Sequence, residues 1–418
     1  MRKTKFSSPF VAVLFASFFA LCVFVSCNQI DKGHTPRENK ISEQSYAMRS
    51  IQDFSTVDID KEIPFKMGEQ DGEDASIKTS YRIGQKEVTR DLWAHVYNWA
   101  TNEKERGGST YRFSKGANIG NVTSDKMQPM VNVTFMDAVV WCNAYTEYLN
   151  FLNQDNTKWV DCTPVYYQYS DEAREALAEF ARTKEEDRRA KYTNLLSKYV
   201  LRVAGEPQDS KTGMEFNEFH LFDGYRLPTV EEWEFASRLT KTASASYDTT
   251  KTVNINGASY HIAKGVCLSG SAYSYADTSA TAQEENAKVA SNFDKLLKGP
   301  LPDSDNPPEV KGLRKENDIG CFDMSGGVWE WTLPDVDRHI VLKKSGKVFI
   351  LDDNYPKVSQ NPEGINRKKG GSYLSKATQE YAIGFVGKFP MKSDDAHKEK
   401  WQRKDIGFRM ARTLQNIF

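Results

Sequence analysis

Cysteine and histidine, the residues that most often bind transition metals or carry redox chemistry, are few and widely spaced in this chain. The sequence has six of each, and beyond residue 27 the cysteines are Cys142, Cys162, Cys267 and Cys321. Zinc sites and thioredoxin-like redox centres draw two ligands from one C-x-x-C motif or a similarly short spacing. No two cysteines and no two histidines stand at such a spacing. The sequence therefore argues against a zinc site, a dithiol redox motif and a histidine-rich metal centre.

The balance of charge excludes one class of partner. Lys and Arg total 56 and Asp and Glu total 57, which gives a formal net charge of −1. A protein that binds nucleic acid through bulk positive charge needs a basic surplus to neutralise phosphates. Aromatic residues make up 12% of the 418 residues, too many for an intrinsically disordered chain. We expect a folded monomer with a sizeable core and no nucleic-acid partner.

The first 26 residues have the pattern of an export signal. Three basic residues among the first five precede an apolar run over 10–25, and Cys27 follows directly after Ser26. This arrangement resembles a bacterial lipoprotein signal, in which the cysteine is acylated and becomes the mature N-terminus. A plain signal peptide or a membrane span is the alternative. We expect an exported protein, anchored in the outer membrane or at the cell surface by a lipid on Cys27, with residues 27–50 as a flexible tether.

The rest of the chain, 51–418, has no periodic repeat and is expected to form one α+β domain. The stretch 170–199 is dense in charged residues and alanine, which predicts a solvated helical insertion within about 151–220. Other helices are expected where a threonine N-cap precedes apolar residues at helical spacing. The further elements expected are helices from Thr89, within 127–149 with Thr134 as a cap, and from Thr229, strands around 54–65, and loops with a hairpin in 240–281.

Six short motifs occur in a fixed order along the domain. They are E-V-T at 87–89, V-T-F-M-D-A at 133–138 with W-C at 141–142, Y-R-L-P-T at 225–229 with E-W-E at 232–234, D-M-S-G-G-V-W-E-W at 323–331, K-G-G-S-Y at 369–373 and G-F-R at 407–409. Together they resemble the formylglycine-generating-enzyme (sulfatase-modifying factor) family. The resemblance runs from about residue 65 to 412. It implies a C-type lectin fold of the formylglycine-generating-enzyme type, with much irregular structure.

Most of the motif residues have the physical character of architecture. Large aromatic side chains need burial, glycines permit tight turns and close backbone approach, and arginine pairs with carboxylates in buried settings. We therefore expect a structural role for buried Trp233, Trp329 and Trp331, tight turns at Gly326, Gly327, Gly370 and Gly371, and buried ion pairs of Arg226 and Arg409 with Glu232 and Glu330.

The resemblance also indicates where catalysis would reside. Enzymes of the family carry two copper-binding cysteines, two and seven residues after the aromatic residue of Gly-Gly-Ser-Tyr/Trp, and soft thiolates suit Cu(I). Here those positions are Ser375 and Glu380, so we expect a non-catalytic member. An oxidase with a different centre, built from these two residues, is the enzymatic alternative. Met410 replaces a cysteine common in the family, so Cys142 is expected to be a buried free thiol.

A structural calcium ion is the one cofactor that the resemblance implies. The family often binds calcium near an Asn-aromatic stretch and near the Trp-Glu-Trp motif, and carboxylate and amide oxygens suit this hard cation. The residues expected to contribute are Asn292, Asp294, Asp303 and Glu330. Gly327 replaces the asparagine that the family usually has before Val-Trp-Glu.

The C-terminal segment 373–406 combines aromatic, small and charged residues, a composition that suits a recognition surface. It lies where the variable proteins of diversity-generating retroelements, which share this fold, carry their mutagenised residues. The resemblance thus implies ligand binding by a surface-displayed module. A protein ligand is preferred to a glycan on the composition of this surface. The lectin motif Glu-Pro-Asn is missing, so the fold gives no warrant for carbohydrate recognition. The expected contact residues are Trp329, Tyr373, Leu374, Ser375, Lys376, Thr378, Glu380, Tyr381, Ile383 and Phe385.

A structural role in an envelope or motility complex is the alternative function. Similar non-catalytic members of the family serve there as lipoproteins. In that case the charged insertion would contact a stoichiometric protein partner.

Overall fold

A central sheet joins the two ends of the domain. The computed structural model describes residues 48–51, 63–77, 80–120, 122, 124–152, 163–168, 170–184, 187–204, 214–216, 224–241, 247–290, 292–297, 314–333, 365–390 and 404–413. The sheet has the antiparallel order β1 (Met48–Ile51), β4 (Tyr81–Gly84), β15 (Ala411–Thr413) and β7 (Tyr225–Arg226). The domain therefore closes on itself through its first and last strands.

A second sheet carries the most motif residues. Its order is β13 (Gly387–Pro390), β12 (Ile365–Lys369), β11 (Trp329–Thr332) and β14 (Ile406–Gly407), with β11 and β14 parallel and the other pairs antiparallel. Because β14 and β15 lie on either side of Phe408 and Arg409, this short segment connects the two sheets.

Three smaller sheets complete the described strands. They are β2 (Ile63–Met67) with β3 (Glu73–Ile77), β5 (Tyr166–Gln168) with β6 (Met214–Phe216), and β8 (Leu239–Thr240), β10 (Ala258–Ala263) and β9 (Tyr247–Ile255). The hairpin expected in 240–281 is confirmed as β9–β10. Its turn residues Asn256 and Gly257 both have positive φ, 53° and 76°, as a tight hairpin turn requires.

Three of the described helices begin at the predicted threonine caps, Thr89, Thr134 and Thr229. The bounds are α2 (Arg90–Ala100), α3 (Glu103–Arg106), α4 (Phe135–Leu152), α5 (Asp171–Ala181), α6 (Arg188–Lys191), α7 (Val230–Arg238), α8 (Ala280–Val289) and α9 (Phe293–Leu296). Thr89 accepts a hydrogen bond from Leu92 N at the start of α2. Thr229 forms a reciprocal capping box with Glu232 at α7. The helix expected within 127–149 starts only after Thr134, because Met130 N pairs with Val88 O in an extended connection.

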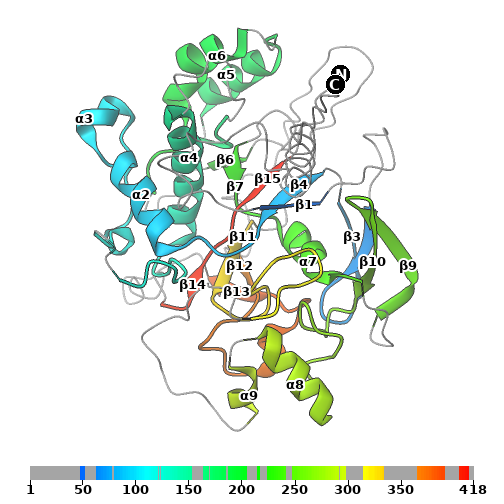
Figure 1. Ribbon diagram of the computed structural model, residues 1–418. Coiled ribbons are helices and arrows are strands. Elements are labelled where there is room, and N and C mark those ends of the chain that lie inside the picture. The colour runs from blue at the N-terminus through cyan, green and yellow to red at the C-terminus, as the bar shows by residue number, and fades with distance from the viewer. Residues whose placement is uncertain are drawn as a thin grey trace, which may run out of the picture.

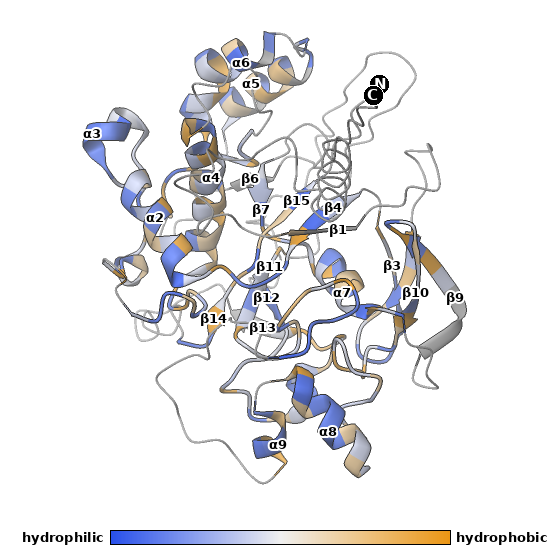
Figure 2. Ribbon diagram, in the orientation of Figure 1, coloured by the Kyte–Doolittle hydropathy of each residue, from blue (hydrophilic) through white to orange (hydrophobic). Residues whose placement is uncertain are grey.

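Figure 1 shows how these elements are arranged: α2, α4, α5 and α6 lie on one side of the sheets, and β3, β9 and β10 lie on the other. Figure 2 shows apolar residues along much of α4, whereas the short α3 is mostly hydrophilic. The difference follows burial, because 13 of the 18 residues of α4 are buried and none of α3 is.

Stacked aromatic rings fix α2 and α4 against the C-terminal motif. The indoles of Trp93 and Trp141 lie 5.4 Å apart at 7°, and the ring of Tyr145 stacks on Trp141 at 5.3 Å. Phe408 meets both indoles edge-on, at 6.0 and 5.6 Å. Such contacts add to the free energy of burying these large side chains. The Gly-Phe-Arg motif is therefore a packing element of the helical side.

The charged insertion is helical as predicted, but its inner face belongs to the core. Ala176, Leu177 and Phe180 of α5 pack into the same apolar cluster as α4. Glu147 of α4 holds this region in place: it pairs with Arg106 and with Arg202 Nη2 (2.7 Å). Tyr111 and Tyr192 donate further hydrogen bonds to Glu147, at 2.9 and 2.7 Å.

Two arginines dominate the titration of Glu147. Burial alone would raise the pKa of its carboxyl, but Arg202 and Arg106 lower the pKa below the ordinary value. The Glu147 carboxylate is therefore charged at neutral pH. The stability that its ion pairs with Arg106 and Arg202 contribute is lost only as the pH falls below the ordinary pKa of glutamate.

We expect Glu147→Ala to reduce the free energy of unfolding by about 3 to 5 kcal/mol, because it leaves the buried guanidinium of Arg202 and the partly buried one of Arg106 without their carboxylate. Glu179→Ala is the matched control: Glu179 pairs with Lys191 in the same region, but both side chains are exposed, so the loss should stay under about 1 kcal/mol. Urea unfolding of both variants measures the difference. Equal losses would contradict the docking role of Glu147.

Candidate functional site

The segment 370–385 begins with a turn that only glycine fits. Gly370 and Gly371 have φ of 94° and 72°. A Cβ on Gly371 would lie 2.7 Å from the Tyr381 ring and 2.8 Å from Glu380 O. The chain can therefore fold back on itself here only with glycine at this position. Positive φ at Gly326 and Gly327, 111° and 65°, confirms the other predicted turn.

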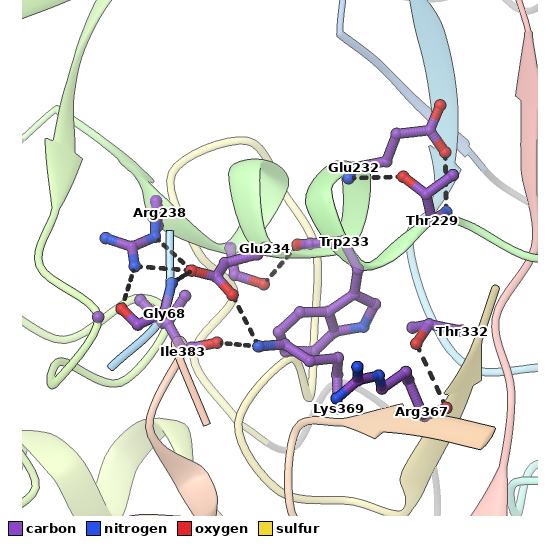
Figure 3. A network of polar contacts seen from close by, with 12 residues as sticks. Gly68, Thr229, Glu232, Trp233, Glu234, Arg238, Thr332, Arg367, Lys369 and Ile383 are labelled. Carbon is purple, nitrogen blue, oxygen red and sulfur yellow. Dashed lines mark hydrogen bonds and ion pairs between the residues drawn. The ribbon is translucent and has the colours of Figure 1, made fainter. Parts of the chain in front are cut away.

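A buried ion-pair network, shown in Figure 3, contacts this segment at Ile383. Lys369 Nζ lies 2.8 Å from Glu234 Oε2 and donates to Ile383 O at 2.6 Å. Arg238 donates to Glu234 Oε1 (2.7 Å) and to Gly68 O (2.8 Å). Burial alone would raise the pKa of Glu234, but Lys369 and Arg238 lower it, so the carboxylate stays charged. The network ties α7, β12 and the 68–72 loop together.

The start of the segment is also held by its own polar groups. Ser372 Oγ donates to Asp405 Oδ2 at 3.0 Å, and Ser372 N donates to Ser375 Oγ at 2.9 Å. The Tyr373 hydroxyl donates to Lys404 O, and the Tyr381 hydroxyl donates to Ser372 O. These bonds fix the backbone of the segment against β14.

The ten predicted contact residues divide into two groups. The side chains of four reach the surface at least in part: Lys376, Thr378, Glu380 and Phe385. The other six are buried, with at most 8% exposure: Trp329, Tyr373, Leu374, Ser375, Tyr381 and Ile383. A side chain buried to that degree cannot contact a ligand while the segment keeps this conformation. In this conformation only the first four are accessible to a ligand, and the binding role of all ten stays a prediction.

The positions of the family's copper ligands have a different chemistry here. Ser375 is 1% exposed, and its hydroxyl oxygen is engaged by Ser372 N. Glu380 Oε1 accepts a hydrogen bond from Lys376 N at 3.2 Å. Neither residue donates to or accepts from the other in the hydrogen bonds described for them. The two residues thus serve the backbone of the loop.

The described cysteines do not form a redox centre. Cys142, Cys267 and Cys321 are buried thiols that form no disulfide, and they lie in three separate apolar clusters. Burial raises the pKa of each of the first two thiols, that of Cys267 to about 12. The prediction that Cys142 is a buried free thiol is confirmed. Cys162 lies outside the described residues.

Three of the four residues expected to bind calcium are described, and one of them, Glu330, is engaged in a buried ion pair. Asn292 Nδ2 donates to Tyr373 O at 3.2 Å, and Asp294 lies exposed on α9. Both oxygens of Glu330 accept hydrogen bonds from Arg409, and Trp233 Nε1 donates to Oε2. Asp303 lies outside the described residues. Within the described part of the chain, no three His, Cys, Asp or Glu side chains gather as a metal site.

The order and placement of the motifs agree with a comparison against known families. The sulfatase-modifying factor enzyme 1-like domain, FGE-sulfatase, matches residues 61–414. The chain belongs to this family. The predicted family and fold class, an α+β C-type lectin fold of the formylglycine-generating-enzyme type, are thereby confirmed. No curated protein matches the chain.

Three solved structures are similar to this FGE-sulfatase domain at low identity. CarF is 19% identical, covers 89% of this chain and 100% of its own, and has a TM-score of 0.47. Treponema denticola variable protein 1 is 16% identical, with 88% and 95% covered and a TM-score of 0.45. PvdO from Pseudomonas aeruginosa is 13% identical, with 84% and 92% covered and a TM-score of 0.39.

Glu87, the first residue of the E-V-T motif, is a buried carboxyl under the Gly-Gly-Val-Trp-Glu turn, a position that the motif itself does not reveal. Glu87 Oε1 accepts a hydrogen bond from Val328 N at 3.4 Å, and Oε2 is buried with no partner among the described residues. Burial raises the pKa of Glu87 well above its ordinary value, Asp323 and Glu330 raise it further, and Arg409 opposes them. The folded FGE-sulfatase domain therefore holds a proton that the unfolded chain releases.

We expect the stability of the protein to fall as the pH rises from the ordinary pKa of glutamate toward the raised pKa of Glu87. Over that interval the unfolded chain binds fewer protons than the folded one. Glu87→Gln is neutral at every pH and keeps an oxygen for Val328, so it should lose less stability than the wild type as the pH rises above the ordinary pKa of glutamate. Urea unfolding measures both slopes, with the exposed Glu316→Gln as control. Identical slopes for wild type and Glu87→Gln would contradict this account.

Proposed function

We propose that the protein is a non-catalytic member of the FGE-sulfatase family that is displayed at the cell surface on a lipid anchor. It binds a protein ligand through residues 370–385, the C-terminal loop. One observation carries the proposal. The loop that holds the copper-binding cysteines in the family's enzymes has no thiol here and instead presents side chains on a buried, ion-paired base. Loops held on a rigid scaffold are the usual place of recognition residues.

The chemistry of the loop supports binding in place of oxidation. A hydroxyl or a carboxylate does not replace a thiolate at a Cu(I) centre. Ser375 is moreover committed to the loop backbone, and Glu380 accepts from Lys376 N. Both groups therefore stabilise a shape.

The contact surface that we propose consists of Lys376, Thr378, Glu380 and Phe385. Lys376 is exposed and the other three are partly so. Phe385 packs against Trp329 with ring centroids 6.0 Å apart, which restricts an aromatic side chain before any ligand arrives. A restricted aromatic residue loses little conformational entropy on binding. Mixed charge with one aromatic anchor suits a protein ligand.

The proposal of a lipid anchor rests on the sequence alone. Cys27 lies outside the described residues, and the acylated cysteine is proposed from the signal pattern at 1–26. Within the described residues, no helix is both long and apolar enough to cross a membrane. A lipid on Cys27 and the polar stretch 28–47, which ends where β1 begins at Met48, would hold the domain away from the bilayer, where its loops can meet a ligand. A structural role in an envelope complex is the competing function.

We expect no oxidation of a cysteine-containing peptide by the full chain after loading with Cu(I) in air. The physical reason is the missing pair of thiolate ligands at Ser375 and Glu380. Mass spectrometry of the peptide detects conversion of the cysteine to an aldehyde. Peptide turnover above that of free copper would contradict the non-catalytic assignment.

We also propose that a retroelement diversifies the loop, and this gives a second test. Among many isolates, substitutions at this locus should concentrate at the exposed positions 376–380. Gly370, Gly371, Gly407 and Arg409 should stay fixed, because their replacement would open the buried base. Uniform drift along the whole chain would contradict a diversified binding site and favour a structural envelope lipoprotein.

A further inference from the structure

We propose that the ligand-contact face is composite: a second loop, 271–277, contributes Tyr273 and Tyr275, and Glu69 is the residue that positions it against the C-terminal loop. This inference rests on the proposed binding function and extends it to a surface that the sequence motifs do not mark. The occupant it fits is a protein, for reasons of composition given below.

Glu69 joins three segments that are far apart in the sequence. Its carboxylate accepts hydrogen bonds from Gln379 Nε2, at 2.9 and 2.7 Å, and from the Tyr275 hydroxyl, at 2.7 Å. All three side chains are partly exposed, so the bonds lie at the surface. The hydrogen bond to Glu69 raises the pKa of Tyr275, so its phenol keeps its proton.

Hydrogen bonds to buried residues of α7 hold the backbone next to Glu69 in place. Arg238 donates to Gly68 O, and Gly68 N donates to Glu234 Oε1 at 2.8 Å. Gly384 N donates to Gly265 O at 2.8 Å, and a Cβ on either glycine would collide with the backbone at Gly68. Three backbones thus meet directly above the Lys369–Glu234–Arg238 network, and Glu69 projects from that junction.

The two loops share one apolar base. Tyr275 packs against a buried cluster of Leu268, Val289, Ala290, Phe293 and Tyr381. Tyr381 belongs to the short 3-10 helix Thr378–Tyr381, which also carries Gln379. The second loop is braced from behind as well, because Ser271 Oγ donates to Asn286 Oδ1 and Asn286 Nδ2 donates to Ser274 O. Neither loop can move far without disturbing the other.

The composition of the second loop is that of a protein-binding surface. Residues 271–276 read Ser-Ala-Tyr-Ser-Tyr-Ala, and Tyr273, Ser274 and Tyr275 are all partly exposed. Tyrosine gives a large amphipathic contact area at a low cost in conformational entropy, and small residues beside it allow close approach. Fixing the Tyr275 hydroxyl on Glu69 reduces that entropic cost further. The face combines these tyrosines with Lys376, Thr378 and Glu380 of the proposed contact surface, which lie close to Gln379 in the chain.

Site-specific photocross-linking tests the composite face in cells that carry the full chain. The photoreactive residue p-benzoylphenylalanine replaces Tyr273 in one variant, Lys376 in a second and Asn194, exposed on the helical insertion, in a third. We expect one and the same protein, identified by mass spectrometry, to be cross-linked from positions 273 and 376 and not from 194. Adding Glu69→Ala should lower both yields about fivefold to tenfold, since it frees Tyr275 and Gln379.

Glu73→Ala is the matched control for that substitution. It removes the same charge from an exposed carboxylate four residues away and should leave both yields unchanged. Each remaining outcome overturns a definite part of the account. A partner cross-linked from 376 but not from 273 overturns the composite face and leaves the proposed function standing. Unchanged yields with Glu69→Ala overturn the positioning role of Glu69. A partner from 194 alone, or from none of the three positions, overturns the proposed function as well.

Discussion

The carboxylate of Glu330 is the point on which the rest of the domain depends. Arg409 binds it through Nε (2.6 Å) and Nη2 (2.5 Å), and Trp233 Nε1 donates to it at 2.7 Å. Arg409 also donates to Gly84 O and Phe322 O. These buried hydrogen bonds thus connect β11, the segment between β14 and β15, α7 and the end of β4. Removal of any partner would leave a charge or a polar group without compensation in the core, which is costly.

This constraint explains how a chain can lack the two thiolates of the family's enzymes and keep the family's fold. The residues that make the buried contacts are motif residues, whereas Ser375 and Glu380 stand at positions where the family's enzymes need thiolates. Their replacement leaves the ion pairs of Glu330 and Glu234 intact. The loop above these pairs is then free to vary in its exposed side chains. A rigid buried base, combined with exposed side chains that can be substituted without disturbing it, is the physical condition for a recognition surface.

Local contacts are what the sequence predicts well. The caps at Thr89 and Thr229 and the bidentate pair of Arg226 with Glu232 (2.7 Å for each bond) join residues at most six positions apart. Most long-range contacts are missed, although the predicted ion pair of Arg409 with Glu330, 79 positions apart, is confirmed. Lys369 finds Glu234 across 135 positions and Gln379 finds Glu69 across 310, and neither spacing leaves a pattern. Six of the ten expected contact residues are buried, and three of these six are aromatic. Composition alone does not show whether such a residue packs into the core or faces the solvent, because that depends on the fold.

Hydrogen–deuterium exchange along the C-terminal loop tests the central claim, a binding face preformed on a buried base. The amides of Tyr373, Ile383 and Gly384 donate to Gly327 O, Cys267 O and Gly265 O. The account predicts that these amides exchange only through global unfolding, with the same protection as core amides. Rapid exchange, insensitive to denaturant, would show that the loop opens by itself and would contradict the account.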